Sequence, residues 1–263
     1  MPKFAANLSW LFTELSFMDR FNAAAEAGFE AVEFLFPYEF GVEDIAKQLQ
    51  TNNLKLALFN MPPGNWDKGD RGIAILPGSQ DAFEQALVTA LDYAEVLECQ
   101  TLHCMAGLIP DDADLFQLEN TYINNLKLAC EAAGEIGCTI VIEPINSFDM
   151  PGYYLNYTEQ AATIVEKVDA ENLKIQFDIY HAQRMAGELA ETFRTYKSSI
   201  GHIQIADNPG RHEPGTGEIN FRYLFDLLDK EGYEGYIGCE YKPYGKTEEG
   251  LNWFIQTNAQ PEH

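Results

Sequence analysis

Eight short runs of apolar and β-branched residues alternate with segments whose apolar residues recur at helical spacing, and this alternation constrains the fold most strongly. The predicted strands cover residues 4–7, 31–36, 54–60, 101–105, 139–143, 173–178, 202–205 and 236–240. The predicted helices cover residues 17–27, 42–49, 82–97, 115–136, 158–168, 189–196 and 223–230, and an eighth begins near Thr247. Strict alternation with short connections requires right-handed crossovers and a parallel sheet, and eight such units close into a (β/α)8 TIM barrel.

An open, doubly wound α/β sheet of the same length is the alternative fold. Such a sheet carries a G-x-G-x-x-G entry into a helix, and no predicted strand of this chain is followed by one. The 263 residues, 46% of them hydrophobic, match the typical size of an eight-stranded α/β barrel. We therefore expect a single TIM-barrel domain over residues 1–263.

The charge balance disfavours several classes of partner. The 41 acidic residues against 17 Lys and Arg give a formal net charge of −24, which repels nucleic acid and anionic membranes. The five cysteines form no C-x-x-C pair, so neither a disulfide framework nor a thiolate zinc site is indicated. Because the sequence contains neither a signal-peptide pattern nor a long apolar run, we expect a cytoplasmic protein.

Oxygen-bearing side chains lie at the ends of the last four predicted strands. They are Glu143, Asp178, Gln204 and Glu240. One carboxylate at a strand end is as often a structural residue bonded to a neighbouring loop. Adjacent parallel strands, however, place their carboxyl ends side by side, at the face where barrel enzymes have their sites. Carboxylate and amide oxygens are typical ligands of Mg²⁺ or Mn²⁺, and we expect such a cation here rather than zinc.

Three further residues are candidates for binding a substrate. His181 follows Asp178 by three residues, beside the predicted cluster, where an imidazole can polarise a substrate oxygen. Arg211, in the glycine-rich loop 207–218, and Lys242, just beyond Glu240, can hold the carboxylate of an anionic substrate. A surface salt bridge is the alternative for both residues, and the favoured one for Lys242.

The connection from residue 61 to residue 79 is longer than most loops between a strand and a helix. It is rich in Pro, Gly, Trp and Asp and has no periodicity. Two interpretations remain open for it, a lid that closes over the site and a static surface loop.

Several longer motifs carry a resemblance to a known family. They are Glu143-Pro144-Ile145-Asn146, Asp178-Ile179-Tyr180-His181, His202-Ile203-Gln204-Ile205-Ala206-Asp207, Gly215-Thr216-Gly217-Glu218 and Gly238-Cys239-Glu240-Tyr241-Lys242-Pro243. These motifs closely resemble the hydroxypyruvate isomerase family, within the xylose-isomerase-like barrel superfamily. The resemblance runs from Phe4 to Trp253, which is essentially the whole chain.

The resemblance implies a reversible isomerisation of hydroxypyruvate and 2-hydroxy-3-oxopropanoate (tartronate semialdehyde). It assigns Glu143 and Glu240 as the paired proton donor and acceptor. It assigns the divalent metal to Glu143, Asp178, Gln204 and Glu240. Relatives that act on larger sugars have His where Gln204 stands, so the identity of the metal and the requirement for it stay open. The implied partner is a small anionic hydroxy- or oxo-acid, with no nucleic acid and no membrane, and homo-oligomerisation is left open.

Three other functions compete with this interpretation. A 2-oxo-tetronate isomerase is similar throughout and differs by one substrate carbon, although the Glu143 and Gly215 motifs look more like the three-carbon enzyme. A metal-dependent abasic-site nuclease of the same superfamily requires more than the five histidines of this chain and a basic surface. A non-catalytic sugar-acid binding protein is expected to have lost a catalytic glutamate, and both glutamates are present.

Overall fold

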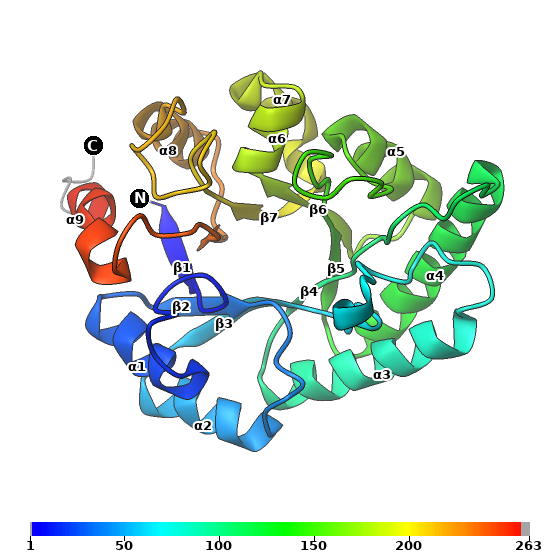
Figure 1. Ribbon diagram of the computed structural model, residues 1–263, viewed down its shortest axis with the longest axis horizontal. Coiled ribbons are helices and arrows are strands. Elements are labelled where there is room, and N and C mark those ends of the chain that lie inside the picture. The colour runs from blue at the N-terminus through cyan, green and yellow to red at the C-terminus, as the bar shows by residue number, and fades with distance from the viewer. Residues whose placement is uncertain (1, 259–263) are drawn as a thin grey trace.

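The computed structural model describes residues 2–258, and within them eight parallel strands close into a barrel surrounded by helices (Figure 1). The strands are β1 (Lys3–Asn7), β2 (Ala31–Phe34), β3 (Lys55–Asn60), β4 (Thr101–His103), β5 (Thr139–Ile142), β6 (Leu173–Asp178), β7 (Ile200–Gln204) and β8 (Tyr236–Cys239). Each strand pairs with the next, and β1 pairs with β8, so that Ala5 lies between Ala31 and Gly238. The TIM barrel predicted from the alternating pattern is confirmed.

Helices follow the strands and cover the outside of the barrel. They are α1 (Phe17–Glu26), α2 (Val42–Thr51), α3 (Gln80–Val96), α4 (Leu115–Glu135), α5 (Thr158–Val168), α6 (Ile179–Met185), α7 (Leu189–Tyr196), α8 (Phe221–Lys230) and α9 (Asn252–Asn258). The sequence pattern did not predict α6. This short helix starts directly after β6 because the Asp178 side chain caps it, accepting hydrogen bonds from the backbone N–H groups of Tyr180 and His181. The last predicted helix is divided into a 3₁₀ turn (Thr247–Gly250) and α9.

The inside of the barrel carries a polar cluster as well as an apolar core. Glu33 of β2 is fully buried and accepts hydrogen bonds from Asn7 and Gln204, while His202 Nε2 lies 2.7 Å from its Oε2. Gly238 of β8 lies against this carboxylate, and a Cβ atom there would collide with both carboxylate oxygens. The glycine is therefore required by the close approach of Glu33.

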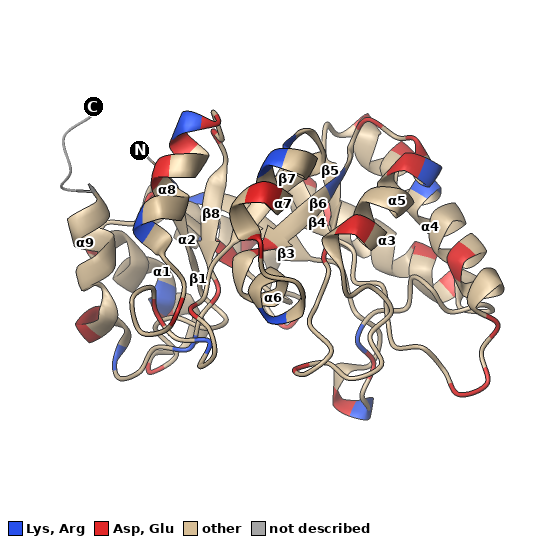
Figure 2. Ribbon diagram, turned by 90° about the horizontal axis from the view of Figure 1, so that it is seen from above, with Lys and Arg blue, Asp and Glu red and all other residues tan. Residues whose placement is uncertain are grey.

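Loops that follow the strands gather on one side of the barrel, along the lower edge of the view in Figure 2, where α6 also lies. In the long 61–79 connection, Ile75 donates to the carbonyl of Ala106 and Asn125 donates to the carbonyl of Ala74. Gly72 packs so closely on the Met105 backbone that a Cβ atom would not fit. These contacts fix the second half of the loop and restrict the lid hypothesis to the part around Trp66.

None of the helices within residues 2–258 is both long enough and apolar enough to cross a lipid bilayer.

Candidate active site

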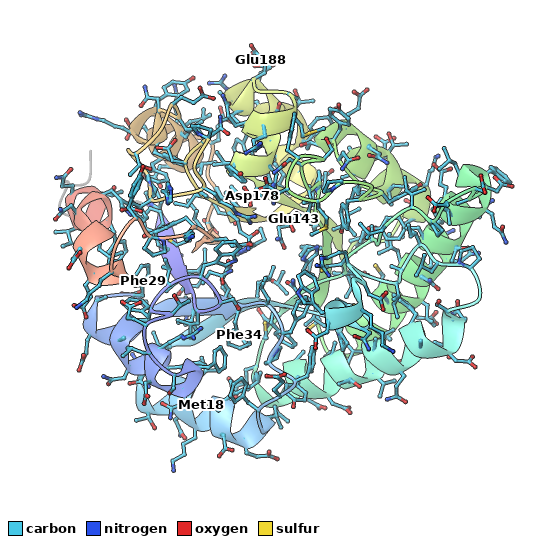
Figure 3. All side chains as sticks on the ribbon, viewed as in Figure 1. Met18, Phe29, Phe34, Glu143, Asp178 and Glu188 are labelled. Carbon is cyan, nitrogen blue, oxygen red and sulfur yellow. The ribbon has the colours of Figure 1, made fainter. Side chains whose placement is uncertain are left out.

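Three strands deliver carboxyl groups to the carboxyl-terminal mouth of the barrel. Glu143 directly follows β5, Asp178 is the last residue of β6, and Glu240 directly follows β8. All three side chains are buried. Figure 3 shows Glu143 and Asp178 close together, and one carboxylate oxygen of each and one ring nitrogen of His181 lie within 4.8 Å of one another. The structure thus brings the predicted carboxyl groups to a common site.

Burial makes the charged forms of these carboxyl groups costly. Burial, followed by repulsion from Glu240 and Asp178, raises the pKa of Glu143 well above its ordinary value. Burial also raises the pKa of Asp178, and it raises the pKa of Glu240 to about 8 although Arg211 opposes the shift. A carboxyl group whose pKa lies near neutral pH can both accept and donate a proton, which suits acid–base chemistry.

A divalent cation fits the carboxyl groups of this site. Glu143 Oε1 and Asp178 Oδ2 are buried and have no hydrogen-bond partner among the described residues. Two unpaired carboxylate oxygens so close together are suited to a hard cation, and its charge would favour their ionised forms. Glu240 differs from these two residues, because its Oε1 already accepts a hydrogen bond of 2.8 Å from Arg211 Nη2.

Gln204, the fourth predicted metal ligand, lies at the end of β7 with both ends of its amide hydrogen-bonded. Its Nε2 donates to Glu33 Oε1 at 2.8 Å, and its Oε1 accepts from Gln176 Nε2 at 2.6 Å. The carboxylate of Glu33 accepts this bond, which fixes the orientation of the amide. Its oxygen has a second lone pair, and its role as a metal ligand stays a prediction.

His181 and His103 each lie close to a different carboxylate oxygen of Glu143. His181 Nε2 lies 3.8 Å from Glu143 Oε1 and 3.7 Å from Asp178 Oδ2, while its Nδ1 lies 2.6 Å from Asn146 Nδ2. Burial and then the nearby Arg211 lower the pKa of His181 well below its ordinary value. His103, in β4, lies with Nε2 3.7 Å from Glu143 Oε2, and burial lowers its pKa to about 3. Both imidazoles are therefore neutral near pH 7.

Arg211 supplies the positive charge at the mouth of the site. Its guanidinium lies over the rings of Trp10 and Tyr180, at 4.5 and 5.2 Å from their centroids, and its Nε is buried without a hydrogen-bond partner among the described residues. Asp207 organises the loop that carries it, because the Asp207 side chain accepts from the N–H groups of Gly215 and Gly217. Gly215 and Gly217 are thus turn residues whose backbone N–H groups bind the carboxylate of Asp207.

Lys242, the other predicted source of positive charge, has an exposed side chain. Its backbone serves the Arg211 loop, since its N–H donates to the carbonyl of Arg211 at 2.8 Å and its carbonyl accepts from His212 Nδ1 at 2.7 Å. The contacts made by Lys242 therefore come from its main chain, and its binding to a substrate stays a prediction.

Sequence reasoning missed several side chains that shape the site. Trp10 supports Arg211, and Asp149 lies 3.7 Å from both Arg211 and Arg184. Both residues come from loops without periodicity, so no pattern indicated them. Glu33 did have a signal, because a charged residue within an otherwise apolar strand calls for a buried partner.

A closed parallel barrel with clustered carboxyl groups at its carboxyl-terminal mouth defines an α/β-barrel enzyme. Residues 21–257 match the family model described as xylose isomerase-like TIM barrel, and the chain belongs to this family. This finding confirms the resemblance seen in the motifs.

Curated relatives match almost the whole chain. The 2-oxo-tetronate isomerase of Cupriavidus necator is 50% identical, over 96% of this chain and 97% of its own length. The hydroxypyruvate isomerase of Escherichia coli is 46% identical, over 96% and 98% respectively. A solved structure described as AP endonuclease, family 2, from Brucella melitensis is 46% identical and superposes with a TM-score of 0.96, covering 97% of this chain and 99% of that one. The expectation that the chain is an isomerase is confirmed by these relatives.

Proposed function

We propose that this protein is a hydroxypyruvate isomerase, which interconverts hydroxypyruvate and 2-hydroxy-3-oxopropanoate by proton transfer. The observation that carries the proposal is the pair Glu143 and Glu240, two buried carboxyl groups at one barrel mouth whose pKa values are raised by burial. Such a pair can remove a proton from one carbon and deliver one to its neighbour. The identity to the Escherichia coli enzyme supports this substrate.

The proposed reaction moves one hydrogen between neighbouring carbons. One glutamate removes a proton from C3, which bears the hydroxyl group, and an enediolate forms across C2 and C3. The second glutamate delivers a proton to C2, while the hydroxyl hydrogen passes from O3 to O2, so that the ketone becomes an aldehyde. His181, whose Nε2 lies beside the carboxyl groups of Glu143 and Asp178, donates a hydrogen bond to an enediolate oxygen.

We propose Glu143, Asp178, Gln204 and Glu240 as the residues that would hold a divalent cation, Mg²⁺ or Mn²⁺. When bound, such a cation supplies positive charge beside the enediolate oxygens and lowers the mutual repulsion of the carboxylates. Glu143 and Asp178 have the strongest support, because each keeps a buried oxygen without a hydrogen bond among the described residues.

Arg211 is the residue proposed to bind the substrate carboxylate. Lys242, whose side chain is exposed, is proposed as a second contact at the edge of the site. Arg211 keeps a buried Nε–H donor that no group in residues 2–258 accepts, beside the Nη2 that binds Glu240. An excess of acidic residues surrounds the mouth, so an anion needs this local charge. The buried free cysteines are consistent with a cytoplasmic location.

A 2-oxo-tetronate isomerase is the second candidate, favoured by the 50% identity to the Cupriavidus necator enzyme. The reacting carbons and the proposed proton transfer are the same for both substrates. A nuclease function, suggested by the description of the Brucella melitensis structure, is disfavoured by the net charge of −24, which repels a DNA backbone.

The test compares kcat/KM for hydroxypyruvate and for 2-oxo-tetronate with the same purified protein, in Mg²⁺ and in EDTA. The proposal predicts the higher value with hydroxypyruvate. A higher value with 2-oxo-tetronate would transfer the function to the four-carbon acid and leave the catalytic residues in place. Absence of turnover with both acids, in either condition, would refute an isomerase of this substrate class.

A further inference from the structure

Asn146 is a fully buried residue in the loop after β5, and its side chain has only one consistent orientation. Its Oδ1 accepts hydrogen bonds from the backbone N–H groups of Phe148, at 3.1 Å, and Asp149, at 2.8 Å. A backbone N–H group only donates, so the atom that it meets must be the amide oxygen. The amide nitrogen therefore faces His181, with Asn146 Nδ2 2.6 Å from His181 Nδ1.

This orientation decides which nitrogen of His181 carries hydrogen. The amide nitrogen of Asn146 only donates, so His181 Nδ1 must accept through its lone pair. A neutral imidazole carries one hydrogen, which then belongs to Nε2. Nε2 is the atom that faces Glu143 Oε1 and Asp178 Oδ2, at 3.8 and 3.7 Å.

We propose that Asn146 is a positioning residue that holds His181 as the Nε2–H tautomer, and so makes His181 a hydrogen-bond donor rather than a metal ligand or a base. The catalytic consequence rests on the proposed isomerase function, whereas the tautomer itself does not. An imidazole binds a metal through a lone pair, and here the only lone pair is used by Asn146. The ligand role is thereby left to the carboxyl groups, although His181 lies close enough to join them.

The donor has a defined use in the proposed reaction. Negative charge grows on an oxygen as C3 loses its proton, and an N–H group fixed toward that oxygen stabilises the transition state. The Asp178 carboxyl group, which caps α6 at the N–H of His181, holds the same residue through its backbone. Asn146 and Asp178 thus orient both the ring and the main chain of His181.

The direct test is a long-range ¹⁵N–¹H correlation spectrum of histidine-labelled protein near neutral pH. The chain has five histidines, so the His181 signals are identified as those absent from the His181→Gln variant. The proposal predicts a hydrogen-bearing Nε2 and a bare Nδ1 in the wild-type protein. A hydrogen on Nδ1 would overturn the proposal, whatever the activity of the protein is.

The Asn146→Asp variant reverses the hydrogen bond without changing the shape of the side chain. Aspartate can still accept from Phe148 and Asp149, but it presents an acceptor to His181 Nδ1, so the ring hydrogen is expected to move to Nδ1. We expect kcat to fall about 100-fold with little change in KM, because one donor to a developing oxyanion is lost. Asn220→Asp is the matched control, since exposed Asn220 also uses Oδ1 to accept a backbone N–H, from Tyr223, away from the site.

A double variant separates positioning from a general effect of the new charge. If Asn146 acts through His181, adding Asn146→Asp to His181→Gln lowers kcat no further. An additional 100-fold loss in the double variant, or full activity of Asn146→Asp alone, would contradict the proposal. The wild-type spectrum decides the tautomer even if Asn146→Asp does not fold.

Discussion

Replacing Glu240 with glutamine separates the chemistry of the site from its architecture. Glu240 Oε1 accepts a hydrogen bond of 2.8 Å from Arg211 Nη2, and the amide oxygen of glutamine can accept the same bond. Burial raises the pKa of Glu240 to about 8, so in metal-free protein at pH 7 the protonated form predominates. Glutamine has the shape and charge of the protonated form. Because glutamine also removes the free-energy cost of keeping a proton that the unfolded chain releases, we expect the unfolding free energy at pH 7 to be no lower than that of the wild type.

The same substitution removes a proton carrier from the reaction. General acid–base catalysis by one positioned group contributes about 100- to 10,000-fold. At 1.36 kcal/mol for each factor of ten, the barrier rises by about 3–5 kcal/mol. The expected result is thus a loss of most turnover in a protein that is at least as stable as the wild type at pH 7.

The assay follows product by proton NMR and stability by thermal unfolding in EDTA. Glu213→Gln is the control, because Glu213 is also buried and its Oε2 accepts the N–H of Tyr244, a bond that glutamine can keep. We expect the control to retain activity within about threefold, as for substitutions outside the reacting groups. Glu240→Gln with at least a tenth of wild-type kcat, or with strongly reduced stability at pH 7, would refute the reasoning.

Three further predictions follow from the geometry. Arg211→Lys keeps the charge but loses the forked donor, so kcat/KM should fall about 10- to 100-fold, mainly through KM; an unchanged KM would contradict the carboxylate assignment. In EDTA, thermal unfolding should show stability falling as pH rises from about 6.5 to about 8, above the pH at which unfolded histidines release their protons, because folded Glu240, like Glu143, keeps a proton that the unfolded chain has released, and added Mg²⁺ should flatten this slope. A slope of opposite sign would exclude Glu240 as its source. Gly238→Ala should lower the unfolding free energy by about 1–3 kcal/mol in denaturant titrations, because its Cβ meets the Glu33 carboxylate, whereas Gly134→Ala in α4 meets only an ordinary contact and should not destabilise.

The barrel was predictable because its signal is local and repeated. Runs such as Ile140, Val141 and Ile142 are fully buried on both faces, as a parallel strand covered by helices requires. The short helix α6 escaped prediction because seven residues are too few for a helical apolar pattern. Its start depends on the hydrogen bonds that the Asp178 side chain accepts from the N–H groups of Tyr180 and His181, which the predicted end of the strand did not by itself indicate.

The carboxyl groups of the site were predictable for a related reason, namely that neighbouring parallel strands end at one rim. Contacts that depend on the path of a loop were not predictable from the sequence. Arg211 reaches Glu240 and Trp10 through a loop whose course is set by Asp207. Likewise, the proposed tautomer of His181 in α6 depends on Asn146, which lies in the loop after β5.

The most direct test of the central claim is a proton NMR time course of hydroxypyruvate in D₂O with the wild-type protein, run with Mg²⁺ and with EDTA. Glutamate-mediated transfer predicts formation of 2-hydroxy-3-oxopropanoate with deuterium at C2, and loss of the C3 proton signal from hydroxypyruvate as the reaction reverses. Product that forms while deuterium stays absent from C2 under extended turnover would contradict exchange through the carboxyl groups. Unchanged hydroxypyruvate in both conditions would contradict the proposed activity itself.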